Sequence, residues 1–285
     1  MIDLHTHSTA SDGSLTPTEL VDLAAEKGLQ AIALTDHDTV AGIGEALRRG
    51  QTVGVRVIPG IELGARQDDY REMHILGYFI RHNHRPLLER LEWLRARRFE
   101  RGQQMVARLS GLGIAVAFER VEELARGGAI GRPHVALALV EAGYVETVAE
   151  AFRRYLTPGQ PAYVEKQRLS PREAIELIQT ADGIPVLAHP ATLGLEQEKL
   201  EGLISELCEW GLRGIEAYWS RHNAEQIEFC KRLAAQFDLA VTGGSDFHGA
   251  AKPGIELGKC GVNGDMPFEL LYDLQTKRRL PMRHT

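Results

Sequence analysis

Two histidines at alternate positions lie near the start of the chain, in the segment MIDLHTHSTASDG. Residues 2–4 are typical of a short buried strand, and His5 and His7 follow directly. On a strand, residues i and i+2 share one face, so both imidazoles can point at the same atom. Asp12 comes a few residues later, beside Gly13, where the chain can turn. Two imidazoles and a carboxylate suit a borderline-hard divalent metal, so we interpret this segment as a metal-binding loop.

Side chains of the same chemistry recur where later predicted strands end. Because the strands of a parallel barrel deliver functional residues at their C-terminal ends, these side chains are expected at one face of such a barrel. The set comprises His5, His7, Asp36, His37, Glu62, His74, His189, Asp246 and His248, with Asp12 in the loop after the first strand. The recurrence predicts one site that holds several metal ions.

Each of these residues also has a structural interpretation. His74 lies in the apolar segment HILGY, where a core histidine bonded to a backbone carbonyl is common. Glu62 follows Pro-Gly and could be a turn residue, and His189 precedes a proline and could be a loop residue. Asp36 or Asp38 could be a helix N-cap, which is the interpretation we favour for Asp38. The coincidence of all these positions favours a shared site over separate structural roles.

Strands and helices alternate along most of the chain. Thr16-Pro17-Thr18-Glu19 and Ser170-Pro171-Arg172-Glu173 are capping boxes with proline at the first helical position. Strands are predicted at 2–4, 31–34, 55–58, 72–80, 186–188, 214–218 and 239–242, with helices at 17–28, in the forties, and at 171–180, 197–210, 224–237 and 268–277. Seven strands separated by helices predict an α/β fold with a parallel sheet, closed into a barrel at this chain length.

The alternation is interrupted between residues 85 and 163, where leucines fall at helical spacing and no strand is evident. We therefore predict a barrel formed by 1–84 and 164–285, with a helical insertion at 85–163. The arginine-rich stretch 90–101 also contains glutamates, so a solvated helix face is as good an interpretation as a path for RNA.

The composition is that of an ordinary globular protein, with 44% hydrophobic and 25% charged residues among 285. The net charge of −6 argues against a polycation that coats nucleic acid. Three cysteines, Cys208, Cys230 and Cys260, show no paired spacing, which favours a reducing compartment. We find no signal peptide, no membrane-spanning run and no sign of an obligate protein partner, and we expect a cytoplasmic protein.

The motifs HTHSTASDG, TDHD, PGIE, HILGY, AHP and GGSDFH together resemble the PHP (polymerase and histidinol phosphatase) domain family. The resemblance runs through nearly the whole chain outside the insertion. It implies a distorted (β/α)7 TIM-like barrel related to amidohydrolases, with a metal cluster that is usually trinuclear.

The resemblance also implies a ligand set. His5, His7, Glu62 and Asp246 would hold one ion, Glu62 would bridge to a second held by His74 and His189, and Asp12, His37 and His248 would hold a third. Of these, Asp12, His37, Glu62, Asp246 and His248 are also expected to serve catalysis. Mixed N and O ligands without thiolate suit Mn²⁺, our preferred ion, or Zn²⁺ or Fe²⁺, better than Mg²⁺. Two or three such ions would activate water and neutralise phosphoryl oxygens, so phosphoester hydrolysis is the expected reaction.

The insertion carries Gly131-Arg132-Pro133-His134, which resembles one PHP subgroup in particular. Its members are stand-alone enzymes that remove the 3′-phosphate from nucleoside 3′,5′-bisphosphates such as pAp, and some trim RNA or short oligonucleotides from the 5′ end. The resemblance implies that Arg132, His134, Lys166 and Arg168 bind the substrate. The structural alternative is a surface arginine followed by a proline that starts a helix.

Two residues near the end of the predicted strand 214–218 are further candidates. Tyr218 could stack on a base, although aromatic residues there are more often packing residues, and His222 could contact phosphate or protonate a leaving oxygen. The alternatives to a nucleotide phosphoesterase are a histidinol-phosphate phosphatase and a non-catalytic, metal-stabilised RNA-binding module.

Overall fold

The computed structural model describes residues 1–67, 72–125, 128, 130–260 and 264–279. The chain divides into two compact units, which we call the barrel unit (residues 1–88 and 169–285) and the helical unit (residues 89–168). The helical unit begins and ends a few residues later than the predicted insertion at 85–163. Lys166 and Arg168 consequently belong to the helical unit and not, as the sequence-based division has it, to the barrel.

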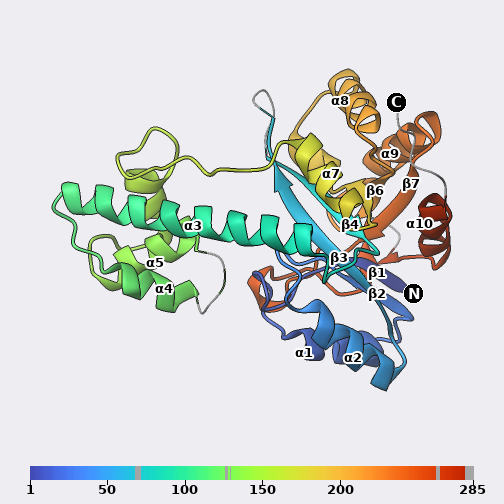
Figure 1. Cartoon of the computed structure of the whole chain (residues 1–285), viewed down its shortest axis with the longest axis horizontal. Helices are drawn as coiled ribbons and strands as arrows, with labels where there is room; N and C mark the ends of the chain where they lie inside the picture. The colour runs from blue at the N-terminus through green and yellow to red at the C-terminus, as the bar shows by residue number, and fades with distance from the viewer. Residues whose placement is uncertain (68–71, 126–127, 129, 261–263, 280–285) are drawn as a thin grey trace. The chain divides into compact units, whose positions relative to one another are not determined.

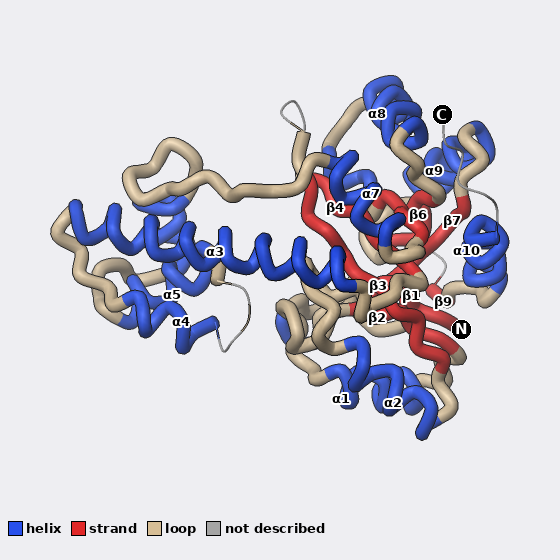
Figure 2. The backbone as a smooth tube through the Cα atoms, viewed as in Figure 1, coloured by secondary structure: helices blue, strands red, loops and turns tan. Residues whose placement is uncertain are grey.

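A seven-stranded sheet forms the centre of the barrel unit (Figure 2). Its strands lie in chain order: β1 (Ile2–Thr6), β2 (Ala31–Leu34), β3 (Arg56–Ala65), β4 (Met73–Tyr78), β5 (Ile184–Leu187), β6 (Gly214–Trp219) and β7 (Ala240–Gly244). The first and last strands meet just beyond their ends, where the Asp246 N–H donates to the His5 carbonyl at 2.9 Å and the His7 N–H to the Phe247 carbonyl at 2.9 Å. The sheet is thus nearly closed into a barrel.

One strand runs against the predicted direction. β1–β2–β3 and β5–β6–β7 are parallel, but β4 is antiparallel to both of its neighbours, β3 and β5. The prediction of a wholly parallel sheet is therefore wrong at this strand. The reason is the connection 66–72, which is shorter than the dozen or so residues that a parallel crossover needs.

Strand β3 continues through Pro59 and Gly60, where the sequence predicts a break. Gly60 passes so close to the neighbouring strand that an added Cβ would lie 2.8 Å from Cγ2 of Thr35 and 3.0 Å from the Leu34 carbonyl oxygen. Glycine thus permits the close approach here and does not end the strand. Glu62 consequently lies within β3 and is not a turn residue.

Helices surround the sheet (Figure 1). They are α1 (Pro17–Glu26), α2 (Ile43–Val53), α7 (Pro171–Thr180), α8 (Gln197–Glu209), α9 (Ala224–Gln236) and α10 (Glu269–Arg279), with short 3-10 turns η2 (Pro190–Leu193) and η3 (Gly249–Ala251) and a small ribbon of β8 (Lys259–Cys260) and β9 (Gly264–Asp265). Both predicted capping boxes are formed, at Thr16 with Glu19 and at Ser170 with Glu173. Inside the barrel, Leu4, Leu76 and Val186 pack with Leu271 and Leu274 of α10.

The helical unit has a hydrophobic core of its own. It contains α3 (Arg85–Gly111, which begins in the barrel unit), α4 (Phe118–Ala125), α5 (Arg132–Glu141), α6 (Val148–Ala151) and the π-helix η1 (Phe152–Leu156). Met105, Leu109, Val121, Leu139 and Leu156 are buried together in this core. The prediction that this part of the chain is helical is confirmed for its described residues.

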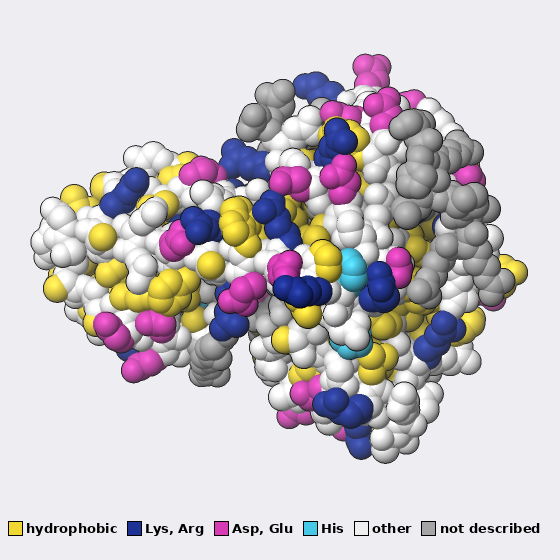
Figure 3. Space-filling view, in the orientation of Figure 1, with side chains coloured by type: hydrophobic (Ala, Val, Ile, Leu, Met, Phe, Trp, Pro, Cys, Tyr) yellow, Lys and Arg dark blue, Asp and Glu magenta, His cyan; other side chains and the backbone are white. Residues whose placement is uncertain are grey.

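Basic and acidic side chains are interspersed on the face of the molecule shown in Figure 3. In the described part of the chain, no helix is both long and apolar enough to cross a membrane.

Candidate metal centre

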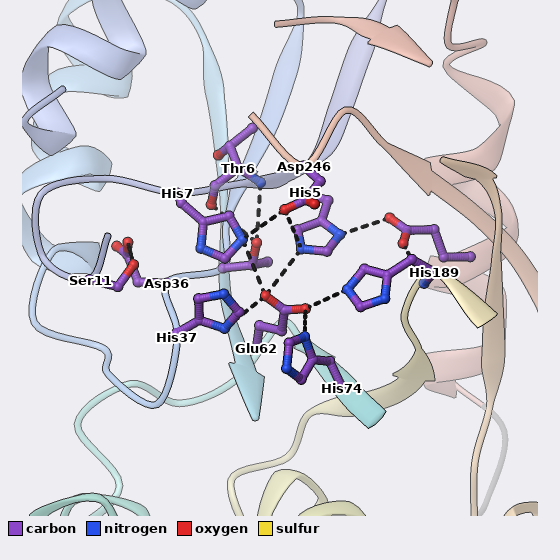
Figure 4. Close-up of polar contacts among 12 residues, drawn as sticks. His5, Thr6, His7, Ser11, Asp36, His37, Glu62, His74, His189 and Asp246 are labelled. Carbon is purple, nitrogen blue, oxygen red and sulfur yellow. Dashed lines mark hydrogen bonds and ion pairs between the residues drawn. The ribbon is translucent and has the colours of Figure 1, made fainter. Parts of the chain in front are cut away.

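Five imidazoles converge on the carboxylate of Glu62 at one edge of the barrel (Figure 4). The Glu62 side chain is fully buried. Its Oε2 lies 3.3 Å from Nε2 of His5, 3.2 Å from Nε2 of His7 and 3.0 Å from Nδ1 of His37, and its Oε1 lies 2.8 Å from Nδ1 of His74 and 3.0 Å from Nε2 of His189. Both carboxylate oxygens are thus surrounded by imidazole nitrogens, as a bridging metal ligand would be.

The strand directions explain why these residues meet. His5 and His7 share one face of the chain at the end of β1, and Glu62 projects from β3. His74 is near the start of β4, not at its end, and pairs with Gly64 of β3. Because β4 is antiparallel, its beginning lies at the edge where the parallel strands end. The reversal of β4 is therefore what brings His74 to the other ligands.

A second group forms around Asp12. Its Oδ1 lies 3.3 Å from Nε2 of His248 and 3.7 Å from Nδ1 of His7, and its Oδ2 lies 3.8 Å from Nε2 of His37. The rings of His7 and His248 are stacked with their centroids 4.0 Å apart. His7 and His37 each face both Asp12 and Glu62, so the two groups are continuous.

Asp246 completes the cluster from the segment after β7. Its Oδ1 lies 3.5 Å from Nε2 of His7 and 3.7 Å from Nε2 of His5. Its other oxygen, Oδ2, is 3.0 Å from Nζ of Lys252 and accepts the indole N–H of Trp219 at 3.4 Å. The Lys252 ammonium and the Trp219 indole thus hold this carboxylate from outside the cluster.

The donor atoms fit divalent metal ions. Four groups of ligand atoms lie within 4.8 Å of one another: His7, Asp12, His37 and His248; His5, Glu62 and His189; His5, His7 and Asp246; and His37, Glu62 and His74. Many of these atoms are buried without a hydrogen-bond partner among the described residues, namely Nε2 of His5, both ring nitrogens of His7, Oε2 of Glu62, Nδ1 of His74 and Nε2 of His248. Buried polar atoms are rarely left unsatisfied, so a cluster of nitrogen and oxygen donors in this state indicates cation ligands.

The electrostatics of the cluster keep its carboxylates ionised. Burial opposes ionisation of Glu62, but His37, His74 and His5 hold its pKa well below its usual range. The pKa of Asp246 is likewise lowered to about 2, because His5, Lys252 and His7 outweigh burial and the charge of Glu62. For His7, burial and then the neighbouring His37 lower the pKa to about 3, so its imidazole stays neutral and can offer a lone pair.

The two aspartates of the TDHD motif after β2, Asp36 and Asp38, have supporting roles. Asp36, counted above among possible ligands, points away from the cluster: it accepts the N–H and the hydroxyl of Ser8, each at 2.7 Å, and the hydroxyl of Ser11 at 2.6 Å (Figure 4). It thereby fixes the loop that carries Asp12. The predicted N-cap role of Asp38 is wrong, because α2 begins at Ile43 and Asp38 instead accepts the backbone N–H of Gly64 at 3.1 Å.

His222 is buried near the cluster, and its hydrogen bonding argues against the role of a general acid that protonates a leaving oxygen. Its Nδ1 lies 2.8 Å from the Ala217 carbonyl, which can only accept, so Nδ1 carries the hydrogen. Burial lowers its pKa, and the neutral ring then presents at Nε2 a lone pair that has no hydrogen-bond partner among the described residues. His222 can accept a hydrogen bond, but it holds no proton at Nε2 for a leaving oxygen.

Tyr218 is only partly exposed and packs against the hydrophobic core of the barrel, which is the packing role considered above. The aromatic residue beside the cluster is its neighbour Trp219, whose ring centroid is 5.4 Å from that of His189.

Two arginines of the helical unit, Arg132 and Arg101, lie near Tyr163. Arg132, the first residue of α5, lies over the rings of Phe152 and Tyr163 and donates to the Leu156 carbonyl at 3.2 Å. Arg101 is buried and donates from Nε to the Val164 carbonyl at 2.8 Å. Burial, followed by the positive charges of Arg132 and Arg168, lowers the pKa of Arg101 to about 10. We call Arg101, Arg132 and Arg168 the arginine cluster; Arg168 pairs with Glu165, whose Oε1 accepts from its Nη1 at 3.1 Å, so part of the positive charge around the buried guanidinium is already offset.

His134 contributes first to local structure. Its Nδ1 accepts the backbone N–H of Gly131 at 3.1 Å, which caps the start of α5. Lys166 lies two residues after Val164, whose carbonyl accepts from Arg101. Arg168 directly precedes Leu169, whose carbonyl accepts the N–H of Arg66, just after β3.

Several of these residues were missed by reasoning from sequence. Glu216 is fully buried in β6 and contacts two of the histidines, and Arg101 belongs to a helix whose role was left open. Glu216 did leave a signal, since a single acidic residue in the apolar strand GIEAYW implies a buried, partnered carboxylate. Arg101 left none, because its neighbours in the cluster are distant in sequence.

Comparison with known proteins relates this chain to phosphoesterases. The family described as "PHP domain" matches residues 3–168. The chain is 38% identical over 257 residues to a 5′-3′ exoribonuclease of Haemophilus influenzae, covering 90% of this chain and 93% of the relative. It is 36% identical over 258 residues to a 3′,5′-nucleoside bisphosphate phosphatase of Chromobacterium violaceum, covering 90% of each. A protein of Bifidobacterium adolescentis described as a "putative metal-dependent phosphoesterase" has a similar structure, with a TM-score of 0.78 at 32% identity, covering 97% of this chain and 96% of that one.

Proposed function

The chain belongs to the PHP domain family, and on this basis we propose that it is a metal-dependent phosphoesterase that removes the 3′-phosphate from nucleoside 3′,5′-bisphosphates such as pAp. The observation that carries the reaction class is the cluster around Glu62, with its many buried donor atoms that lack hydrogen-bond partners. Trimming of short RNA from the 5′ end is a second activity of the same site, supported by the relative named 5′-3′ exoribonuclease.

We propose the metal ligands that the family resemblance implies. His5, His7, Glu62 and Asp246 would hold one ion, Glu62, His74 and His189 a second, and Asp12, His37 and His248 a third; the four groups of ligand atoms described above comprise the same nine residues, but they place His189 with His5 and His74 with His37. Mn²⁺ is the ion we propose, with Zn²⁺ and Fe²⁺ as alternatives, because the donors are nitrogen and oxygen. When bound, such ions supply Lewis acidity toward the phosphate and lower the pKa of water.

The protein's own side chains must supply the rest of the chemistry. Asp246 is kept ionised and oriented by Lys252 and Trp219, so its carboxylate does not need to reorganise when substrate arrives. His222 presents a lone pair at Nε2 and is suited to accept a hydrogen bond from a substrate hydroxyl. Metal ions alone would bind any phosphate, so the preference for a bisphosphate needs a further group that recognises the second phosphate.

We propose that the arginine cluster, with His134 and Lys166, recognises that second phosphate. A guanidinium can bind phosphate oxygens in bidentate fashion, and the buried Arg101 adds to the positive charge at Arg132, while Glu165 offsets part of the charge of Arg168. Arg132 is held by two aromatic rings and a carbonyl, so its orientation is fixed before an anion arrives. Tyr218 is not part of this proposal, because it packs in the core.

A substrate panel tests the proposed reaction. Mn²⁺-loaded protein is assayed for phosphate release from pAp, histidinol phosphate, a small aryl phosphate and a 5′-phosphorylated oligonucleotide. We expect 5′-AMP and phosphate from pAp, with one water consumed per phosphate released. Adenosine 3′-phosphate as the main product would reverse the proposed polarity. A preference for histidinol phosphate, or an absence of metal-dependent turnover on every substrate, would favour one of the two alternatives named above.

Substitution of Arg132 tests the second-phosphate site. A charge-assisted contact is worth about 1.5–3 kcal/mol, so Arg132→Ala should lose roughly 10- to 100-fold in kcat/KM on pAp. The loss on the aryl phosphate, which has a single phosphate, should be much smaller, and metal content should not change. Arg120→Ala is the matched control, because Arg120 is exposed and pairs with Glu141 and Glu123. Equal losses on both substrates would instead assign Arg132 to the chemical step.

A further inference from the structure

Both oxygens of one buried carboxylate in β6 are used by histidines of the metal centre. Oε1 of Glu216 lies 2.9 Å from Nδ1 of His5, and Oε2 accepts the backbone N–H of His189 at 2.7 Å. The side chain of Glu216 is fully buried, as is that of His5. Glu216 therefore connects a ligand from β1 with a ligand from the segment after β5, while facing the side of His5 opposite to Glu62.

We propose that Glu216 is a positioning residue, which fixes His5 in the tautomer with hydrogen on Nδ1 and holds the backbone of His189, so that both rings present Nε2 to the metal centre. It is not itself a metal ligand in this proposal. The inference rests on the proposed metal centre and is independent of the substrate.

The hydrogen-bond pattern supports this tautomer for His5. A carboxylate oxygen can only accept from Nδ1, so the hydrogen must be on Nδ1, and in the neutral ring Nε2 is left with a lone pair. That Nε2 lies 3.3 Å from Oε2 of Glu62 and has no hydrogen-bond partner among the described residues. In the neutral ring, the lone pairs of Nε2 and of Glu62 Oε2 face each other in a buried site, an arrangement that a cation between them satisfies. The carboxylate behind the ring thus prepares His5 for a metal ion and raises its basicity as a ligand.

At His189 the carboxylate stabilises an unusual backbone. The φ angle of this non-glycine residue is +26°, outside the regions that L-amino acids prefer, and the Oε2 hydrogen bond is made to its N–H. The ring is oriented separately: the Thr192 hydroxyl donates to the His189 carbonyl at 2.9 Å, so its oxygen accepts from Nδ1 of His189 at 3.1 Å. Nε2 is again left facing Glu62, at 3.0 Å.

An isosteric substitution tests the proposal because an amide cannot satisfy both contacts. In Glu216→Gln, an oxygen placed toward the His189 N–H puts the NH₂ group against Nδ1 of His5, which forces the hydrogen onto Nε2. The opposite orientation sets the NH₂ against the His189 N–H. Either arrangement spoils one metal ligand while the volume of the side chain stays the same.

The first readout is the tautomer of His5 in the metal-free protein, measured by long-range ¹H–¹⁵N NMR, with the His5 signals assigned by their loss in His5→Gln. We expect hydrogen on Nδ1 in the unsubstituted protein, and a neutral ring with hydrogen on Nε2 alone would overturn the proposal. This measurement needs no Glu216 variant, so it decides the matter even if Glu216→Gln does not fold.

The second readout is metal affinity, measured with Mn²⁺ and Zn²⁺ against a competing chelator. Outer-shell partners of metal-bound histidines typically contribute 10- to 100-fold, so we expect Glu216→Gln to bind the most affected ion about that much more weakly. Glu45→Gln is the matched control: Glu45 accepts the N–H and hydroxyl of Thr18, away from the centre, and its loss should leave the affinity unchanged. Unchanged affinity in Glu216→Gln would refute the proposal, whereas a failure on pAp with intact metal binding would refute only the substrate.

Discussion

Replacing Arg101 by methionine should separate the stability of the helical unit from its ability to bind anions. Burial, Arg132 and Arg168 lower the pKa of Arg101 from 12.5 to about 10, which corresponds to about 3 kcal/mol of unfavourable free energy while the group is charged. Because the folded state has the lower pKa, this penalty applies in full at pH 7 and is relieved only as the pH rises through 10. Removing the charge removes the penalty.

The substitution also removes a favourable contact, so the net change must be estimated from both. The charged hydrogen bond to the Val164 carbonyl, 2.8 Å long, is worth about 1.5–3 kcal/mol. Arg101→Met should therefore leave the free energy of unfolding unchanged or raise it by up to about 2 kcal/mol. A bound anion offsets the repulsion among the three arginines, so the unsubstituted protein should gain about 2.7 kcal/mol from an anion at a hundredfold its Kd. The variant should lose most of that gain.

The assay is urea unfolding of the metal-free full chain at pH 7, with and without AMP or sulfate, so that no metal ion competes for the anion. Arg101→Lys keeps the charge and should keep part of the anion response, and Arg120→Met controls for loss of an exposed arginine. If Arg101→Met destabilises the protein by several kcal/mol and responds to the anion as before, Arg101 is a structural residue and the reasoning is refuted.

Three further predictions concern the barrel unit and its thiols. Glu62→Ala should lose bound metal and activity together. Full metal content of this variant by elemental analysis would refute the assignment of Glu62 as the ligand that bridges two ions. In the metal-free protein the folded state keeps His7 neutral down to its pKa of about 3, whereas the unfolded chain protonates it below about pH 6.5. The free energy of unfolding therefore falls as the pH drops from 6.5 toward 3. When the pH is lowered from 7 to 5, the free energy of unfolding of His7→Gln, measured with urea, should thus fall by about 2 kcal/mol less than that of the parent. Equal losses in the two proteins would contradict the lowered pKa of His7. Burial raises the pKa of Cys208 to about 11 and of Cys230 to about 12. At pH 8 a disulfide reagent should therefore modify both thiols at least about 100-fold more slowly in the folded protein than in the protein unfolded in urea. Rapid modification of the folded protein would show that the thiols are accessible.

Features that depend on a few neighbouring residues could be predicted from the sequence. The capping boxes at Thr16 and Ser170 and the proline start of α5 are formed as expected, because each is decided within one helical turn. The histidine and carboxylate motifs were equally visible, since each is a short segment at a strand. That these segments meet followed from the alternation of strands and helices together with the family resemblance.

Contacts between residues far apart in sequence could not be predicted in the same way. Glu216 is 211 residues from His5, and nothing in its local sequence says which strand face meets which histidine. The same holds for Arg101, whose partners Arg132 and Arg168 come from α5 and from the end of the helical unit. Such supporting residues are recognised only once the register of β6 and the packing around α3 are known.

The direction of β4 shows where the sequence contained more than was used. Ligands were expected at the C-terminal ends of strands, and His74 was counted among them although it lies near the start of β4. The connection 66–72 is too short for a parallel crossover, so β4 could have been recognised as antiparallel from the positions of the strands alone.

The reversal also means that the chain leaves β4 at Tyr78, opposite Gly60, and not at the edge that carries His74. It is the returning segment that reaches this edge, where Leu169 pairs with Ala65, one position from the pair formed by Gly64 and His74. In a mixed barrel, candidate ligands should accordingly be sought at one edge of the sheet, which an antiparallel strand reaches with its first residues.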